Sequence, residues 1–159
     1  MYQLEVKRWL VEHMFSPTEG WHVQVDVDAM ERGKGGTHPP DKAAKAAIAE
    51  AALVALGARI GAHARYGRAD IVAEHEQHGI HIIEVEGSSS KQKEQALYSA
   101  LGQLVLQMKG AEVSYILAVP DDGSWERQLS KVPSHALAQM RLSLALVSQQ
   151  GVRTLPLTP

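Results

Sequence analysis

The segment RADIVAEHEQHGIHIIEVEG, residues 68–87, is the most informative part of the chain for the fold. Residues 68–76 have the composition of a β-strand, residues 77–79 form a short turn containing glycine, and residues 80–86 have the composition of a returning strand. The segment therefore predicts a β-hairpin, and the rest of the chain is interpreted around it.

Three carboxylates lie at one end of this predicted hairpin. Asp70 begins the first strand, and Glu84 and Glu86 lie near the end of the second. Residues two apart on a strand point to the same face, so Glu84 and Glu86 share a face while Val85 points to the other. Clustered carboxylates repel one another unless a cation lies between them, and Mg²⁺ prefers such oxygen ligands. A metal site is one interpretation; the other is an antiparallel hairpin that exposes its acids to solvent.

Upstream of the hairpin, residues 21–28 alternate between apolar and polar side chains, which predicts a half-exposed strand. A helix is predicted from Asp41 to Leu56, and because it is nearly all apolar we expect it to be buried on more than one side. A short strand is expected at residues 59–65. Residues 2–14 fit either a helix or a strand, and residues 1–40 are treated as an N-terminal extension of uncertain role.

Downstream of the hairpin, the chain alternates between helices and strands. We expect a helix at residues 91–109, a strand at 113–119, a final helix at 133–149 and a last strand at 152–157. A hairpin followed by helical crossovers gives a mixed sheet with helices on both faces. The predicted fold class is α/β, a three-layer sandwich with a mixed central β-sheet flanked by helices.

Composition limits the remaining possibilities. The chain has 159 residues and 45% hydrophobic content, which suits one domain spanning residues 1–159. There is no cysteine, so disulfides and thiolate metal sites are excluded. The formal net charge of −2 argues against broad, unspecific attraction to nucleic acid. The sequence has neither a membrane-spanning apolar run nor a signal-peptide pattern, so we expect a cytoplasmic protein without membrane contact.

The hairpin segment resembles the PD-(D/E)XK motif of the restriction-endonuclease-like nuclease superfamily. Asp70, followed by a hairpin and then Glu84-Val85-Glu86-Gly87, carries the resemblance. The helix before the hairpin is similar to a core helix that often contributes a glutamate, here Glu50. The helix after it is similar to one that in many members carries a glutamine near the active site, here Gln103.

The resemblance implies a Mg²⁺-dependent nuclease that hydrolyses phosphodiester bonds in DNA, with Mn²⁺ as a possible substitute. Asp70, Glu84 and the backbone carbonyl of Val85 would hold the metal, and Glu50 would bind it directly or through water. Glu86 stands where the family usually has lysine, and it would accept a proton from water or ligate a second metal.

Basic side chains would complete such a site. Some members supply the lysine from the following helix, which makes Lys91 the candidate for contact with the scissile phosphate and Lys93 a further substrate-binding candidate. Arg68 would bind the DNA backbone, as would Arg65, although pairing of these arginines with nearby acids is the ordinary alternative. Gln103 is the third substrate-binding candidate.

Several alternatives stay open. The glutamate in place of lysine and the slightly acidic charge favour a catalytically inactive endonuclease-like domain that acts as a nucleic-acid-binding or protein-interaction module. Glu50 would then simply lie on the narrow exposed stripe of its helix with Lys42 or Lys45. The high apolar content is compatible with a homodimer. The histidines near the hairpin turn do not complete a tetrahedral zinc set, so zinc is not expected.

Overall fold

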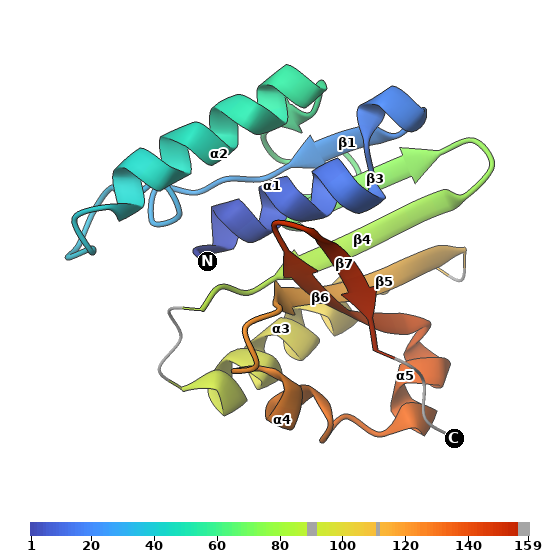
Figure 1. Ribbon diagram of the computed structural model, residues 1–159. Helices are drawn as coiled ribbons and strands as arrows, with labels where there is room; N and C mark the ends of the chain where they lie inside the picture. Colours follow the sequence, from blue (N-terminus) through green and yellow to red (C-terminus); the bar gives the residue numbers. More distant parts are fainter. Residues whose placement is uncertain (89–91, 111, 156–159) are drawn as a thin grey trace.

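Seven strands form one mixed β-sheet (Figure 1). The computed structural model describes residues 1–88, 92–110 and 112–155. The strand order across the sheet is β2-β1-β3-β4-β5-β6-β7. The bounds are β1 His22–Val25, β2 Arg59–Ile60, β3 Ile71–His75, β4 Gly79–Val85, β5 Val113–Pro120, β6 Leu142–Ser148 and β7 Gly151–Thr154.

The predicted hairpin is the antiparallel pair β3–β4 at the centre of this sheet. Strand β1 pairs antiparallel with β3, and the two-residue strand β2 pairs parallel with β1. On the other side, β4, β5 and β6 run parallel, and β7 returns antiparallel to β6. The acidic end of the hairpin therefore lies within the sheet, with paired strands on both sides.

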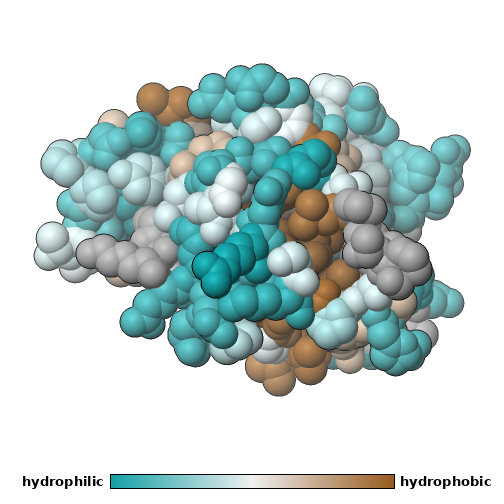
Figure 2. All heavy atoms as spheres, turned by 60° about the horizontal axis from the view of Figure 1, so that its bottom comes forward, coloured by the Kyte–Doolittle hydropathy of each residue, from teal (hydrophilic) through white to brown (hydrophobic). Residues whose placement is uncertain are grey.

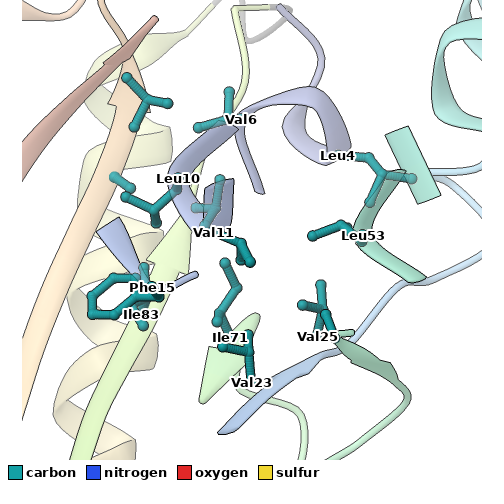
Figure 3. Close-up of a cluster of buried hydrophobic side chains, with 14 of the residues drawn as sticks. Leu4, Val6, Leu10, Val11, Phe15, Val23, Val25, Leu53, Ile71 and Ile83 are labelled. Atoms are coloured by element: carbon teal, nitrogen blue, oxygen red, sulfur yellow. The ribbon is translucent and has the colours of Figure 1, made fainter. Parts of the chain in front are cut away.

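Helices cover both faces of the sheet (Figure 1). Helices α1 and α2 contribute buried side chains to one apolar cluster, part of which Figure 3 shows, and α3, α4 and α5 contribute to the other. The helical elements are α1 Gln3–Met14, the 3₁₀ turn Pro17–Glu19, α2 Lys42–Leu56, α3 Lys93–Gln107, α4 Glu126–Leu129 and α5 Ser134–Met140.

The two-residue period of the hairpin strands separates these clusters. Ile71 and Ile83 are paired across the hairpin and lie in the cluster with α1. Val72 and Ile82 are also paired and lie in the cluster with α3. Because both faces are apolar and covered, the hairpin is an interior one, and an acidic side chain at its end lies against a desolvated core.

Residues 1–25, whose role the sequence leaves open, contribute α1 and β1 to this core. Leu4, Leu10 and Val11 of α1 are fully buried, and Figure 3 shows them beside side chains from β1 and the hairpin. Helix α1 begins where the Glu5 carboxylate accepts a hydrogen bond of 2.9 Å from the backbone N–H of Tyr2. The expected strand at residues 21–28 is shorter, at His22–Val25.

Two sequence expectations about the fold are wrong. Helix α2 has the expected bounds but is not buried on several sides: Ala46, Ala49 and Leu53 are its buried residues, because it packs on α1 through one stripe only. The final helix expected at residues 133–149 ends at Met140. Arg141 has a left-handed φ of 51°, and strand β6 follows between β5 and β7. The apolar residues of β6 fit both the helical period of 3.6 and the strand period of 2, so pairing with the neighbouring strands selects the strand.

Other boundaries differ slightly from expectation. The strand expected at residues 59–65 is the two-residue β2, and the helix expected at 91–109 is α3, Lys93–Gln107. Within the described ranges, no helix combines the length and apolarity needed to cross a bilayer.

Candidate functional site

The register of the hairpin brings Asp70 and Glu84 together. Ile71 lies opposite Ile83, so the next position along the antiparallel ladder places Asp70 opposite Glu84. The two carboxyl groups are within hydrogen-bonding reach of each other, and Glu86 interacts electrostatically with Asp70. The convergence of these acids that the hairpin implied is therefore present.

Asp70 is held by three neighbouring groups. Its Oδ1 lies 2.7 Å from Nζ of Lys7, and its Oδ2 accepts a hydrogen bond of 2.8 Å from the backbone N–H of Val85. The side-chain amide of Gln3 donates to both oxygens, at 3.3 and 3.2 Å. Helix α1 and strand β4 thus fix the orientation of this carboxylate at the end of the hairpin.

Lys7 is the cation at the centre of the site. Its side chain is 0% exposed, and its Nζ lies 2.7 Å from Oε1 of Glu31 as well as 2.7 Å from Asp70. It also donates a hydrogen bond of 2.6 Å to the backbone carbonyl of Asp26. These anionic partners raise the pKa of Lys7 although burial, the largest single effect, lowers it, so the ammonium stays charged.

Sequence reasoning missed Lys7, although a signal exists. Leu4 and Val11, three residues before it and four after it, are buried, so Lys7 occupies an apolar stripe of α1. A lysine in such a stripe is rarely buried unless it is paired. If residues 2–14 are interpreted as a helix, Lys7 falls within its apolar stripe, and a buried acidic partner is then predicted.

Glu31 is the second functional residue that the sequence did not indicate. It lies in the loop between β1 and α2, with a side chain 7% exposed. Its Oε2 accepts from the backbone N–H of Asp28, at 3.1 Å, and its own N–H donates to Asp28 Oδ1, at 2.8 Å. Burial raises the pKa of Glu31, and Lys7 opposes that shift. Nothing in the spacing of a glycine-rich loop predicts this placement.

Glu84 and Glu86 carry the most perturbed carboxyl groups of the site. Burial, the Asp70 charge and the hydrogen bond with Asp70 together raise the pKa of Glu84 to about 9. Burial and the charge of Asp70 raise the pKa of Glu86 to about 7. Glu31 and Asp70 already share the ammonium of Lys7, so Glu84, whose pKa is raised to about 9, is neutral at pH 7.

A pocket of about 200 Å³ opens beside the cluster. Glu31 and Glu86 line it, so these two acids can be reached from solvent. Gly87 explains the close approach of the chain at this point: a Cβ on this residue would lie 2.8 Å from the backbone nitrogen of Gln3. The glycine after the acidic motif therefore lets the first turn of α1 pack directly against the end of β4. The pocket is lined by Tyr2, Gln3, Asp28, Met30, Glu31, Lys42, Glu86 and Gly87.

Glu50 and Arg68 have partners other than Asp70, Glu84 and Glu86. Both oxygens of the Glu50 carboxylate accept from the guanidinium of Arg32, at 2.7 and 2.8 Å, and this hydrogen bond lowers the pKa of Glu50. Glu50 therefore pairs with neither Lys42 nor Lys45 and takes no part in the contacts of Asp70. Arg68 is 72% exposed and its Nε lies 3.0 Å from Asp26 Oδ2, which is the ordinary pairing with a nearby acid.

The other predicted site residues lie at the end of the hairpin or after it. Lys93 donates to the backbone carbonyl of Ser88, at 3.1 Å, and its Nζ lies 5.1 Å from the ring centroid of Trp125. Gln103 is exposed on α3, whereas Leu104 beside it is buried against the sheet. Val85 is buried, with its side chain in the α1 cluster. Lys91 lies outside the described residues.

The carboxylate oxygens of the cluster are of the type that binds hard cations, but the ammonium of Lys7 lies between Asp70 and Glu31 in this structure. Among residues 1–88, 92–110 and 112–155, no three histidine or acidic side chains are arranged so that they hold one metal ion. Carboxylate oxygens are the ligands that hard cations prefer, and Glu84 in this cluster has a pKa raised to about 9.

Comparison of the chain with protein-family models, with curated proteins and with solved structures finds no match in any of the three.

Proposed function

We propose that this chain is a restriction-endonuclease-like three-layer sandwich that hydrolyses phosphodiester bonds in DNA with Mg²⁺, or with Mn²⁺ in its place. The observation that carries the proposal is the meeting of Asp70, Glu84 and Glu86 at one end of an interior hairpin, beside a pocket that Glu86 lines. An excess of desolvated carboxylates is costly in a purely structural role, and binding of a divalent cation offsets that cost.

In this proposal each acid has a distinct part. Asp70, Glu84 and the Val85 carbonyl would hold the metal, which would supply a positive charge for the phosphate and a lower pKa for the attacking water. Glu86 accepts the proton of that water, because a pKa of about 7 lets it change protonation state near neutral pH. Lys7 acts as a positioning residue: its ammonium, 2.7 Å from Asp70, fixes the carboxylate without facing the pocket.

A second candidate function rests on the fact that the oxygens of Asp70 already have protein partners. Lys7, Gln3 and the Val85 N–H already satisfy both of its oxygens. If Lys7 is a permanent replacement for the metal, the chain is a catalytically inactive domain of the same class that binds nucleic acid or another protein. The two candidates differ in whether a divalent cation binds.

Calorimetric titration with Mg²⁺ and Mn²⁺ separates the candidates. We expect the wild-type protein to bind, the Asp70→Asn and Glu86→Gln variants to lose at least about tenfold in affinity, and Glu74→Gln to bind like wild type. Glu74 is the matched control, since it lies on the same hairpin and its carboxylate pairs with His63 instead. Circular dichroism verifies that each variant is folded.

The pH dependence of binding sharpens the test. Metal ligation requires Glu84 to lose its proton, so affinity should rise as the pH increases toward about 9. Cleavage of plasmid and single-stranded DNA, with and without metal, then tests catalysis. Absence of metal binding by the wild-type protein would reject the nuclease hypothesis and leave the inactive module. Metal binding without cleavage of any DNA form would also reject the nuclease hypothesis.

A further inference from the structure

A groove of about 450 Å³ opens at the turn end of the β3–β4 hairpin, on the face of the sheet that α3 covers. Its apolar floor lies on two parallel strands, because Ile80 of β4 is paired with Val113 of β5, and Tyr115 continues it along β5. Figure 2, which turns the α3 side of the molecule forward, shows hydrophobic side chains gathered among hydrophilic ones on this side. A cavity of this size accommodates one small organic molecule.

The loop between β2 and β3 brings two further side chains, Arg65 and Tyr66, to the groove. His63 fixes this loop, because its backbone exchanges two hydrogen bonds with Gly67, at 2.9 and 2.8 Å. Its Nδ1 accepts from the backbone N–H groups of Arg65 and Tyr66, at 3.1 and 3.2 Å. Its Nε2 lies 3.4 Å from Glu74 of β3, so the loop folds back toward the turn end of the hairpin. The fold itself therefore holds Arg65 and Tyr66 in position.

Positive charge predominates around this groove, although the whole chain has a formal net charge of −2. Arg65 lines the groove from the β2–β3 loop, and Lys109 lines it from the segment that follows α3. Neither side chain forms an ion pair with an acid in the part of the chain that the structure describes. The charge of Arg141 also acts on the hydroxyl of Tyr115, and Glu112 lines the groove as an acid. Cations in a cleft with an apolar floor attract an anion.

Tyr66 adds a polar group that lacks a partner. It is 4% exposed, yet its hydroxyl makes no hydrogen bond with any residue that the structure describes. A buried hydroxyl without a partner is costly, and buried tyrosines usually find one. The hydroxyl of Tyr115 donates only a long hydrogen bond, of 3.4 Å, to the backbone carbonyl of Gln107. A bound anion would therefore satisfy donors that the protein leaves unused.

These groups match the parts of a nucleoside monophosphate. A phosphate monoester carries about two negative charges at pH 7, and the guanidinium of Arg65 with the ammonium of Lys109 supplies two positive ones. The carboxylate of Glu112 is an acceptor for a sugar hydroxyl, a role that acids have in other nucleotide sites. Ile80 and Val113 offer apolar surface to a base. Inorganic phosphate would leave both the carboxylate and this surface without contact.

We propose that this groove binds a nucleoside monophosphate, with its phosphate between Arg65 and Lys109 and a hydrogen bond from the hydroxyl of Tyr66. A free nucleotide and the phosphorylated end of a nucleic-acid strand share this chemistry. The proposal is independent of the proposed metal site, because Ile80 lies near the opposite end of β4 from Glu84 and the groove needs no divalent cation.

Calorimetric titration with adenosine monophosphate, in the presence of a chelator, tests the proposal. We expect the wild-type protein to bind it at least about tenfold more tightly than adenosine or inorganic phosphate. Arg65→Gln and Lys109→Gln should each weaken binding at least about tenfold, and Tyr66→Phe, which removes only a hydroxyl, about threefold. Arg127→Gln is the matched control, since Arg127 is an exposed arginine of α4, and it should bind like wild type. Circular dichroism verifies that each variant is folded.

Three results would overturn the proposal. The first is a wild-type protein that binds no adenosine monophosphate even at millimolar concentration. The second is an equal affinity for inorganic phosphate, which would make the groove a site for simple anions. The third is binding that survives both Arg65→Gln and Lys109→Gln, since the nucleotide would then lie elsewhere on the molecule.

Competition with a single-stranded oligothymidylate identifies the source of the nucleotide. If the oligonucleotide displaces adenosine monophosphate only when it carries a terminal phosphate, the groove binds strand ends. If it displaces nothing in either form, the groove binds free nucleotides, and both results support the proposal. Equal displacement with and without the terminal phosphate would contradict the placement of that phosphate between Arg65 and Lys109.

Discussion

The two ends of the β3–β4 hairpin hold titratable side chains in opposite electrostatic situations. At one end, Glu84 is buried beside Asp70 and its pKa is raised to about 9. At the other, His81 lies between Phe15 and Trp21, with ring centroids 5.5 and 5.4 Å away, and burial lowers its pKa. In both places desolvation favours the neutral form.

The difference between the ends lies in what compensates the burial. The acidic end is stabilised by a fully buried ammonium and a network of charge-assisted hydrogen bonds. At the histidine end, His75, His78 and His81 surround Trp21, at centroid distances of 4.9, 5.9 and 5.4 Å. His75 and His81 also hydrogen-bond the backbone carbonyl groups of Glu19 and His78, both at 3.2 Å. Carboxylates gathered around one buried ammonium suit a site that exchanges cations and protons, whereas packed aromatic and imidazole rings suit a structural cap of the hairpin.

Removing the buried cation should have the largest effect on stability. Lys7→Met leaves Asp70 and Glu31 as neighbouring buried acids without their partner, and we expect the free energy of unfolding at pH 7 to fall by about 3–5 kcal/mol. Urea denaturation measures this loss. Lys45→Met is the control, since the Lys45–Asp41 pair is about half exposed and solvent screening leaves it little effect on stability.

A second variant keeps this prediction testable if Lys7→Met does not fold. The double change Lys7→Met with Glu31→Gln removes one of the two unpaired charges, so it should recover part of the lost stability. A Lys7→Met protein as stable as wild type would show that the ammonium is not what balances the acidic end.

How far the sequence predicts this acidic end depends on the range of the interaction. The period-two pattern and the turn at residues 77–79 predict the hairpin, and the hairpin register then places Asp70 opposite Glu84. The counter-ion comes from Lys7, separated from Asp70 by more than sixty residues in the chain, and no local pattern encodes that pairing. The pairing of Glu50 with Arg32 is not predictable from the sequence for the same reason, because Arg32 lies in a loop without periodic structure.

The boundary between β6 and the predicted final helix shows a related limit. The apolar residues of RLSLALVS fit a helix or a buried strand when considered alone. Pairing with both β5 and β7 satisfies the backbone of β6 in the sheet, and this non-local pairing selects the strand.

Neutralising Glu84 should produce an intermediate effect, which depends on pH. Its folded-state pKa of about 9 exceeds the ordinary value of 4.5, so the folded protein binds a proton that the unfolded chain has released between these pH values. The stability of the metal-free wild-type protein should therefore fall as the pH rises from 5 to 9. In Glu84→Gln this decline should be smaller by a few kcal/mol, since a shift of this size gives at most roughly 5 kcal/mol over this pH range.

Urea midpoints at pH 5, 7 and 9, measured in the presence of a chelator, test that slope. Glu74→Gln serves again as the acid on the same hairpin that lies outside the cluster. Equal slopes for wild type and Glu84→Gln would mean that Glu84 is ionised in the folded protein at neutral pH and that the acidic end tolerates its full charge.

The histidine end should give the smallest effect, with the opposite pH dependence. Burial lowers the folded-state pKa of His81 below the ordinary 6.5, so below that pH the unfolded chain takes up a proton that the folded protein excludes. This imidazole therefore costs stability as the pH falls from 7 to 5, and His81→Asn should reduce that loss by less than about 1 kcal/mol. His78→Asn is the control, because His78 is exposed at the turn. If His81→Asn instead reduced the loss of stability toward alkaline pH, the two ends would not differ in the sign of their proton linkage, and the contrast between them would fail.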